Sequence, residues 1–277
     1  MKILLILLAL ALTACRTFPT PDERRQHADA LAVPHGWHAI HIPAGQFALT
    51  AYLPAKPRKH DTLTIYLEGD GFAWQTARQP SADPTPLDPM ALRLALAHPQ
   101  GNAAYLARPC QYIGTQTPPC AEGYWTNQRF APEVVNAANR AIDALKARFG
   151  AQRLILVGYS GGAAVAALAA ATRHDVDQLV TVAGNLDHRA WTTYHRIQPL
   201  SGSLNPADAI DALQPLRKWH FAGGRDEIIP PALVYAFANR FPTGRQSVVH
   251  IEPEFNHRCC WAENWPRLWR EAVTQPH

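Results

Sequence analysis

Ser160 is the first residue of this chain whose setting predicts nucleophilic chemistry. It lies in Gly-Tyr-Ser-Gly-Gly at positions 158–162, after the apolar run 154–157 and before an alanine-rich stretch. A serine hydroxyl becomes an effective nucleophile when a sharp strand-to-helix turn holds it out of the backbone, near a base and backbone N–H groups. Gly158 and Gly162 suit such a turn, because strand and helix pack there too closely for Cβ atoms. The alternatives are a helix cap and a phosphate site at a helix N-terminus, but no Lys-Ser/Thr pair follows the glycines.

A nucleophilic serine needs a base, and the base needs a carboxylate that orients it. Asp226 follows the predicted strand 217–221 in a loop whose two glycines let the chain turn. His257 occupies the loop after the next predicted strand, 246–251. An aspartate before a helix is also a common N-cap, which is the alternative role for Asp226. We predict that His257 is the base and that Asp226 is its orienting acid.

Other residues could fill these two roles, but their positions favour them less. Two of the thirteen histidines, His220 and His250, lie within predicted strands and are expected to be packed or surface residues. Asp187 follows the predicted strand 178–182 and is the alternative acid by the same positional reasoning.

Strands and helices alternate along the chain, and each candidate follows a strand. The predicted strands are apolar or alternating runs at residues 37–42, 47–53, 62–67, 103–106, 153–157, 178–182, 217–221 and 246–251. The predicted helices span residues 87–97, 133–149, 163–172, 231–241 and 262–272. This alternation predicts an α/β fold with a mostly parallel central sheet and helices on both faces. Ligands bind such sheets outside the carboxyl ends of the strands, so we expect the candidates to meet there.

The chain order Ser160, Asp226, His257 and the positions of these residues after strands resemble the α/β-hydrolase superfamily. The resemblance covers about residues 37–272. It implies the α/β-hydrolase fold, a Ser-His-Asp triad made of these three residues, and no metal ion or other cofactor.

The same resemblance gives a role to the loop Glu68-Gly69-Asp70-Gly71. The superfamily often has His-Gly-Gly-Gly there and takes one backbone N–H of the oxyanion hole from it. Glu68 stands where histidine is usual, and the donor stays open between Asp70 and Gly71. The second donor would be the N–H of Gly161, the residue after the nucleophile.

The first fifteen residues predict export. Lys2 precedes an uninterrupted apolar run over residues 3–12, which is too short to span a membrane and has the anatomy of a signal peptide. Leu12-Thr13-Ala14-Cys15 resembles the lipobox of bacterial lipoproteins. The resemblance implies that Cys15 is acylated and anchors the protein to the outer membrane, facing the periplasm or the outside. An ordinary signal peptide with an incidental cysteine is the alternative, and it would give a periplasmic or secreted protein.

A chain of 277 residues is long enough for one large α/β domain. We expect a lipoprotein-type signal peptide over residues 1–15, a tether over residues 16–35 and a single domain over residues 36–277. A short flap at about residues 185–214 stands where the superfamily often inserts a cap. Apolar residues make up 47% of the chain, and the net charge of +4 is spread without runs of Lys or Arg. This composition is that of a globular protein that does not bind nucleic acid.

Export also gives a meaning to the other four cysteines, Cys110, Cys120, Cys259 and Cys260. An even number in an oxidising compartment predicts disulfides, and the short loop from Cys110 to Cys120 is the favoured bridge. Cys259 and Cys260 either bond to each other or pair elsewhere, so three pairings stay open. A zinc site is the competing interpretation, but Cys110 and Cys120 lack the spacing of a ligand pair.

Taken together, these residues predict a serine hydrolase of the esterase or lipase kind that acts on a small-molecule or lipid-like acyl substrate. A peptidase or a thioesterase would use the same triad. A non-catalytic binding or envelope lipoprotein is the alternative from a different class, since a fold does not imply a function. The sequence makes no prediction of oligomeric state.

Overall fold

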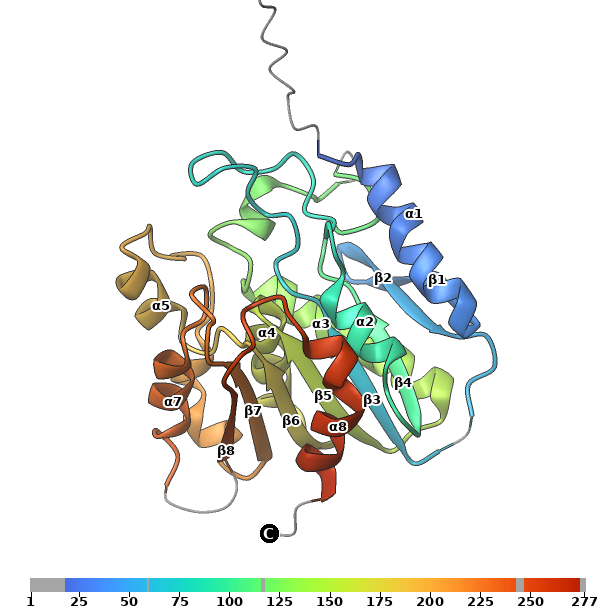
Figure 1. Ribbon diagram of the computed structural model, residues 1–277. Coiled ribbons are helices and arrows are strands. Elements are labelled where there is room, and N and C mark those ends of the chain that lie inside the picture. Colours follow the sequence, from blue (N-terminus) through green and yellow to red (C-terminus); the bar gives the residue numbers. More distant parts are fainter. Residues whose placement is uncertain (1–17, 59, 116–117, 243–246, 275–277) are drawn as a thin grey trace, which may run out of the picture.

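The computed structural model describes residues 18–58, 60–115, 118–242 and 247–274. Within these residues an eight-stranded sheet has the strand order β1-β2-β4-β3-β5-β6-β7-β8 (Figure 1). The strands are β1 (Trp37–Ala44), β2 (Phe47–Pro54), β3 (Thr62–Leu67), β4 (Asn102–Leu106), β5 (Arg153–Tyr159), β6 (Val176–Val182), β7 (Arg217–Gly223) and β8 (Ser247–Glu252). The pairs β1-β2 and β2-β4 are antiparallel, and all other pairs are parallel. The predicted mostly parallel sheet is confirmed.

Helices cover both faces of the sheet, as predicted. The helices are α1 (Pro21–Ala32), α2 (Met90–Leu96), α3 (Pro132–Phe149), α4 (Gly161–Ala170), α5 (His188–His195), α6 (Ile210–Leu213), α7 (Pro231–Ala238) and α8 (Trp261–Thr274). Residues of α3 and α4 share one buried apolar cluster with the sheet. Residues of α1, α2 and α8 belong to the cluster on the opposite face.

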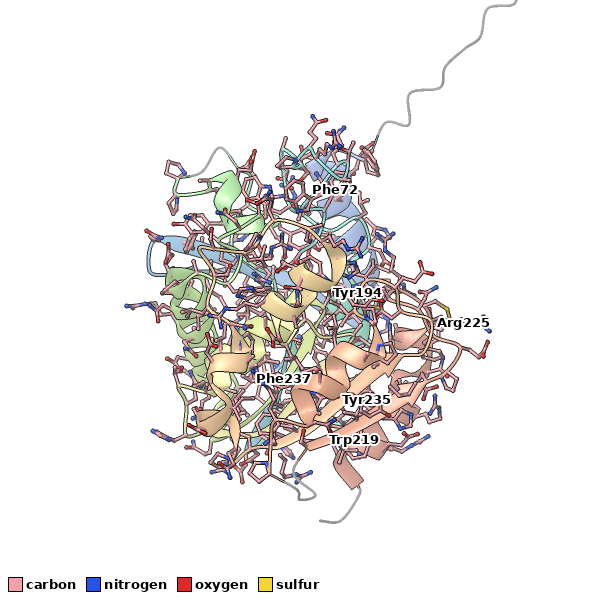
Figure 2. All side chains as sticks on the ribbon, turned by 90° about the vertical axis from the view of Figure 1, so that its left-hand side faces the viewer. Phe72, Tyr194, Trp219, Arg225, Tyr235 and Phe237 are labelled. Carbon is pink, nitrogen blue, oxygen red and sulfur yellow. A yellow bond between two sulfur atoms is a disulfide. The ribbon has the colours of Figure 1, made fainter. Side chains whose placement is uncertain are left out.

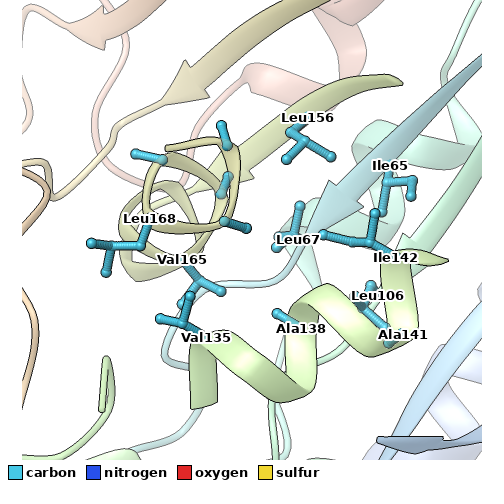
Figure 3. Packing of buried hydrophobic residues seen from close by; sticks show 14 of the residues in the cluster. Ile65, Leu67, Leu106, Val135, Ala138, Ala141, Ile142, Leu156, Val165 and Leu168 are labelled. Atoms are coloured by element: carbon cyan, nitrogen blue, oxygen red, sulfur yellow. The ribbon is translucent and has the colours of Figure 1, made fainter. Parts of the chain in front are cut away.

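The core around β5 is built from branched side chains and alanines. Helix α3 turns one apolar stripe, including Val135 and Ile142, toward the sheet (Figure 3). Every residue of α4 is buried, and eight of its ten residues are alanine or glycine, the exceptions being Val165 and Leu168. Small side chains let α4 lie close to the strand that precedes it, and this closeness fixes the turn between them.

The segment expected to be a tether packs on the domain instead. Helix α1 begins with a capping box in which the Thr20 hydroxyl accepts a hydrogen bond from the Glu23 N–H and the Glu23 carboxylate accepts one from the Thr20 N–H. Ala28 and Ala32 of this helix are completely buried in an apolar cluster that includes residues of the sheet. The prediction of a tether over residues 16–35 is therefore wrong from residue 18 onward, because Phe18 packs on Phe72 and α1 docks through its buried residues Arg24, Ala28 and Ala32.

The predicted signal peptide over residues 1–15, with Cys15, lies outside the described residues and stays a prediction. In the part of the chain that the structure describes, no helix combines the length and the apolar character needed to cross a membrane.

Candidate active site

Ser160 lies in a tight turn between β5 and α4. Its backbone has φ 51° and ψ −122°, a combination that a residue with a Cβ rarely adopts. Three backbone hydrogen bonds hold the turn: the Ser160 N–H donates to Val182 O at 2.9 Å, and the Ser160 carbonyl accepts from the N–H groups of Ala163 and Asn185 at 3.1 and 3.0 Å. Such a backbone costs about 1–3 kcal/mol and persists where the surroundings over-determine it, often at functional sites.

Glycines on both sides make the turn possible. A Cβ on Gly158 would collide with the Ala163 backbone, and a Cβ on Gly162 would collide with the carbonyl oxygens of Leu67 and Glu68. Any larger residue at position 162 would push α4 away from the end of β3. The two glycines therefore serve close packing, as the sequence predicted.

The side chains of Ser160, His257 and Asp226 form one hydrogen-bonded series. His257 Nε2 lies 3.0 Å from Ser160 Oγ, and His257 Nδ1 lies 2.8 Å from Asp226 Oδ2. The strands before these residues, β5, β7 and β8, end at the same edge of the sheet. The Asp226 side chain is fully buried, and that of His257 is 11% exposed. The geometry allows His257 to receive the serine proton while Asp226 fixes the orientation of the ring.

The loop between β7 and α7 uses both oxygens of Asp226. While Oδ2 faces the imidazole, Oδ1 accepts hydrogen bonds from the N–H groups of Ile228 and Ile229, each at 2.8 Å. The alternative role of Asp226 as a helix cap is wrong, because the N-cap of α7 is Pro230 and the two amides belong to the loop before the helix. These two amides hold the carboxylate in one orientation.

The loop after β8 holds His257 from its backbone side. The His257 carbonyl accepts hydrogen bonds from the Tyr159 hydroxyl at 3.0 Å and from Trp261 Nε1 at 3.2 Å. Asn256 Oδ1 accepts the N–H groups of Arg258 and Cys259, which closes the turn before α8. Residues of β5 and α8 thereby fix the position of His257 relative to Ser160.

Asp187, the alternative acid, has other partners. Its Oδ1 caps α5 by accepting from the N–H groups of Arg189 and Ala190, and it also accepts from Asn205 Nδ2. The predicted flap contains α5, which hydrogen-bonds to the neighbouring loop: Trp191 Nε1 donates to Ile228 O at 2.8 Å. His220 is fully buried within β7, and burial lowers its pKa to about 3. His220 is a core residue, as expected.

The candidate oxyanion-hole donors lie in two segments, the loop after β3 and the first residue of α4. Within the described residues, the N–H groups of Asp70, Gly71 and Gly161 donate to no other protein group. Gly71 has φ 66°, and a Cβ there would collide with the carbonyl oxygen of Pro84, so the loop after β3 requires glycine at this position. Asp70 and Gly71 therefore both stay candidate donors beside Gly161.

Asp70, Arg108 and Arg129 form a charge cluster next to Gly161 that the sequence did not predict. A Cβ on Gly161 would collide with Asp70 Oδ1, so the Asp70 carboxylate lies directly against the residue after the nucleophile. Asp70 Oδ2 lies 2.5 Å from Arg129 Nη1, and Oδ1 lies 3.5 Å from Arg108 Nη1. Both arginine side chains are only 6% exposed. Burial lowers the pKa of Arg108 to about 10, while the nearby Asp70 carboxylate opposes that shift.

In this cluster two guanidinium groups face a single carboxylate. A lone carboxylate beside Gly161 would repel an oxyanion that develops there. Arg108 and Arg129 offset that charge, and they are held in turn by the carbonyl oxygens of Arg129 and Thr126, which accept from Arg108 Nη2 and Arg129 Nε.

Glu68, the first residue after β3, is buried. Its Oε1 accepts the Gly69 N–H at 2.9 Å and the Ala91 N–H at 3.4 Å. Burial raises the pKa of Glu68 to about 7. A carboxyl group thus stands where the superfamily usually has histidine, and it ties the loop to the start of α2.

The four cysteines for which disulfides were predicted form two bonded pairs. Cys110 and Cys120 are bonded across a sequence separation of 10, with their Cα atoms 5.6 Å apart. Cys259 and Cys260 are bonded to each other at the start of α8. The structure selects this pairing from the three that the sequence left open. Within the described residues, no group of three or more His, Cys, Asp or Glu side chains could hold a metal ion.

Comparison with known proteins gives matches in structure only. No family model matches the chain, and no curated protein matches it in sequence. The structure is similar to the ferulic acid complex of Est1E from Butyrivibrio proteoclasticus, with a TM-score of 0.60 and 15% identity over 86% of this chain and 100% of that chain. It is also similar to the esterase Pf2001 from Pyrococcus furiosus, with a TM-score of 0.59 and 12% identity over 93% of this chain and 92% of that chain.

A third similar structure is an α/β serine hydrolase without a lid, XC6422 from Xanthomonas campestris, with a TM-score of 0.54 and 16% identity over 86% of this chain and 94% of that chain. At these identities the likeness concerns architecture and not activity. The strand order, the helices on both faces and these structural matches together show that the chain has the α/β-hydrolase fold.

Proposed function

We propose that this protein is a serine hydrolase that cleaves an ester bond through an acyl-enzyme, with Ser160 as nucleophile, His257 as base and Asp226 as orienting acid. The observation that carries the proposal is the continuous series of hydrogen bonds from Ser160 Oγ through the imidazole to Asp226, at 3.0 and 2.8 Å, on a strained strand-to-helix turn. A serine that only capped a helix would need neither the buried acid nor the base.

In the first half of the proposed reaction, Ser160 Oγ attacks the ester carbonyl carbon while its proton passes to His257 Nε2. The tetrahedral intermediate collapses when the bond to the leaving oxygen breaks, and that oxygen takes the proton from Nε2. In the second half, water attacks the acyl-enzyme and gives its proton to Nε2. Collapse then releases the carboxylic acid and returns the proton to Ser160.

The oxyanion of both intermediates would accept hydrogen bonds from the Gly161 N–H and from the N–H of Asp70 or Gly71. Loss of one such donor typically costs about 3 kcal/mol of barrier. The excess positive charge of Arg108 and Arg129 over Asp70 favours the developing negative charge.

The test uses p-nitrophenyl acetate and butyrate as substrates and a fluorophosphonate probe as a label. The wild type should hydrolyse both esters, and the probe should label the peptide that contains Ser160. Ser160→Ala should lower kcat/KM by at least about 10³-fold. Retained activity in Ser160→Ala would show that the nucleophile is assigned wrongly. A wild type that neither hydrolyses nor reacts with the probe would favour the non-catalytic lipoprotein.

The acyl bond is part of the proposal, because a thioesterase or a peptidase could use the same three side chains. Matched thioester and peptide p-nitroanilide substrates should be cleaved with a lower kcat/KM than the ester. A faster reaction with either one would replace the ester in the proposal.

We also propose that acylation of Cys15 anchors the mature chain to the outer membrane. The support is the lipobox-like Leu12-Thr13-Ala14-Cys15 after an apolar run. Mass spectrometry of the membrane fraction should find an acylated cysteine as the first residue, whereas an unmodified periplasmic chain would contradict the anchor.

A further inference from the structure

Exposed apolar side chains gather around the loops at the carboxyl ends of the strands. Among the described residues, eight large apolar side chains are at least 41% exposed, and six of these belong to this end of the molecule. We call the six the apolar rim: Phe18, Trp74, Tyr194, Ile197, Leu204 and Ile228. The other two, Val33 and Tyr235, lie at the end of α1 and on α7.

Five of the six rim residues belong to the segments that follow β3, β6 and β7, on the same edge of the sheet as the candidate active site. Trp74 follows β3 four residues after Asp70, and Ile228 follows β7 two residues after Asp226. The remaining loop members lie in and after α5, between β6 and α6. In Figure 2, Tyr194 lies nearer than Tyr235 to the end of the molecule that carries Phe72. Apolar surface concentrated at one end is typical of an interaction site.

The first described residues are fixed at the same end. The Phe18 ring packs on Phe72, with the ring centroids 4.7 Å apart, and Phe72 belongs to the loop that carries Asp70. The Arg24 guanidinium also contacts Phe72, at 5.4 Å from the centroid of its ring. It donates a hydrogen bond to Asp83 O at 3.1 Å. Figure 1 shows the N-terminal end of α1 beside these loops and far from the end of α8.

Covalent geometry then limits how far the rim can lie from an anchor on Cys15. A tether of 20 residues could extend over about 70 Å and would leave the orientation of the domain free. Because Phe18 is already packed on the domain, only Arg16 and Thr17 separate it from Cys15, and the three steps from Cys15 to Phe18 span at most about 11 Å. An acyl anchor at Cys15 would hold this end of the molecule at the membrane surface.

We infer that the apolar rim docks on a phospholipid bilayer, so that the mouth of the active site opens onto the membrane and takes amphiphilic esters that lie in its surface. The inference rests on the proposed hydrolase function and on the proposed anchor. Trp, Tyr and aliphatic side chains at one end of a domain suit the boundary between lipid headgroups and acyl chains. The bilayer is favoured over a protein partner because an acylated Cys15, with only two residues between it and Phe18, would hold the rim next to the bilayer.

The test compares two substrates on the full-length, acylated protein reconstituted in phosphatidylethanolamine and phosphatidylglycerol vesicles. One substrate is p-nitrophenyl acetate in water, and the other is 4-methylumbelliferyl oleate dissolved in the vesicles. The double variant Trp74→Glu/Leu204→Glu should hydrolyse the bilayer substrate about tenfold more slowly, because two charges replace apolar contacts with lipid, and should retain hydrolysis of the water-soluble ester. Tyr235→Glu is the matched control, since Tyr235 is equally exposed outside the rim.

Equal rates of the double variant and Tyr235→Glu on the bilayer substrate would overturn the docking surface. A flexible insertion of 20 residues between Thr17 and Phe18 should also slow only the bilayer substrate, and an unchanged rate would contradict the role of the short link.

Docking is also measured without turnover, which separates this inference from the proposed function. Brominated phosphatidylcholine in the vesicles should quench the fluorescence of Trp74, so the quenched fraction should fall in Trp74→Phe. Quenching without any ester hydrolysis would leave the docking surface standing and refute the hydrolase. Hydrolysis of p-nitrophenyl acetate with no quenching of Trp74 would support the hydrolase and refute the docking surface.

Discussion

The Asp226 carboxylate has a separate set of partners for each of its oxygens. Oδ1 accepts two backbone N–H groups, so Oδ2 always faces His257 Nδ1. In Asp226→Asn the amide oxygen would keep the two backbone hydrogen bonds, and the NH₂ group would face the imidazole. Nδ1 would then be an acceptor and Nε2 would carry the proton, so the ring could not receive the proton of Ser160.

We therefore expect Asp226→Asn to lower kcat for p-nitrophenyl esters by about 10³–10⁴-fold while the thermal unfolding midpoint changes little. Glu227→Gln, an exposed neighbour, is the matched control and should keep the wild-type kcat. A mutant within tenfold of the wild type would mean that Asp226 serves only to hold the loop of Ile228 and Ile229.

Glu68 adds a pH-dependent term to stability. Its pKa rises by burial from an ordinary value of 4.5 to about 7, so the folded state holds this proton more tightly than the unfolded state does. Stability from the protonated form is complete below pH 4.5 and is lost as the pH rises toward 7. The full difference is about 3 kcal/mol.

The variant Glu68→Gln keeps a carbonyl oxygen for the Gly69 and Ala91 N–H groups but never ionises. Urea unfolding should give similar free energies for variant and wild type at pH 4, and a variant that is more stable by about 3 kcal/mol at pH 8. Glu122→Gln, which changes an exposed carboxylate, should show no such difference. A constant offset at both pH values would show that Glu68 does not titrate in this range.

The turn between β5 and α4 depends on the contact of Gly162 with the end of β3. A methyl group at this position would meet the carbonyl oxygens of Leu67 and Glu68, neither of which can move without breaking the sheet. Gly162→Ala should lower the free energy of unfolding by about 3 kcal/mol or more. Gly114→Ala has open space around the new Cβ and a left-handed φ of 79°, so it should cost only about 1 kcal/mol. Denaturant titration of both variants measures the difference.

Most strands and long helices could be predicted because each carries its signal locally. β3 is a continuous run of β-branched and apolar residues, and α3 has one apolar face and a closing glycine at position 150. Helix α1 was missed because its buried residues are Arg24, Ala28 and Ala32, which form no hydrophobic stripe. The capping box at Thr20 and Glu23 was the local signal that could have found it.

The charge cluster beside Ser160 could not be predicted from local patterns. Arg108 and Arg129 lie 38 and 59 positions after Asp70, in loops without regular spacing. Ser160, Asp226 and His257 were easier to find, because the order of strands in a parallel sheet brings the ends of β5, β7 and β8 to one edge. Topology predicts which loops meet, but it does not predict which buried charges pair inside them.

The bond between Cys110 and Cys120 restricts the unfolded chain of the whole protein. The closed loop contains about ten residues, for which loop-closure entropy predicts a stabilisation of about 2–3 kcal/mol. The double variant Cys110→Ser/Cys120→Ser should lose that amount in denaturant unfolding of the oxidised protein. Adding a reductant should destabilise the wild type and leave the double variant much less affected, and an equal effect on both would assign the change to Cys259 and Cys260.

The order of the site residues along the chain has a consequence for when the protein becomes reactive. Synthesis proceeds from the N-terminus, so the turn with Ser160 is made long before His257, which follows the last strand, and before α8, whose Trp261 holds the His257 carbonyl. A nascent chain carries its serine without a base for the final third of its length. If the proposed triad acts as described, reactivity toward acyl groups begins only when nearly the whole chain has been made.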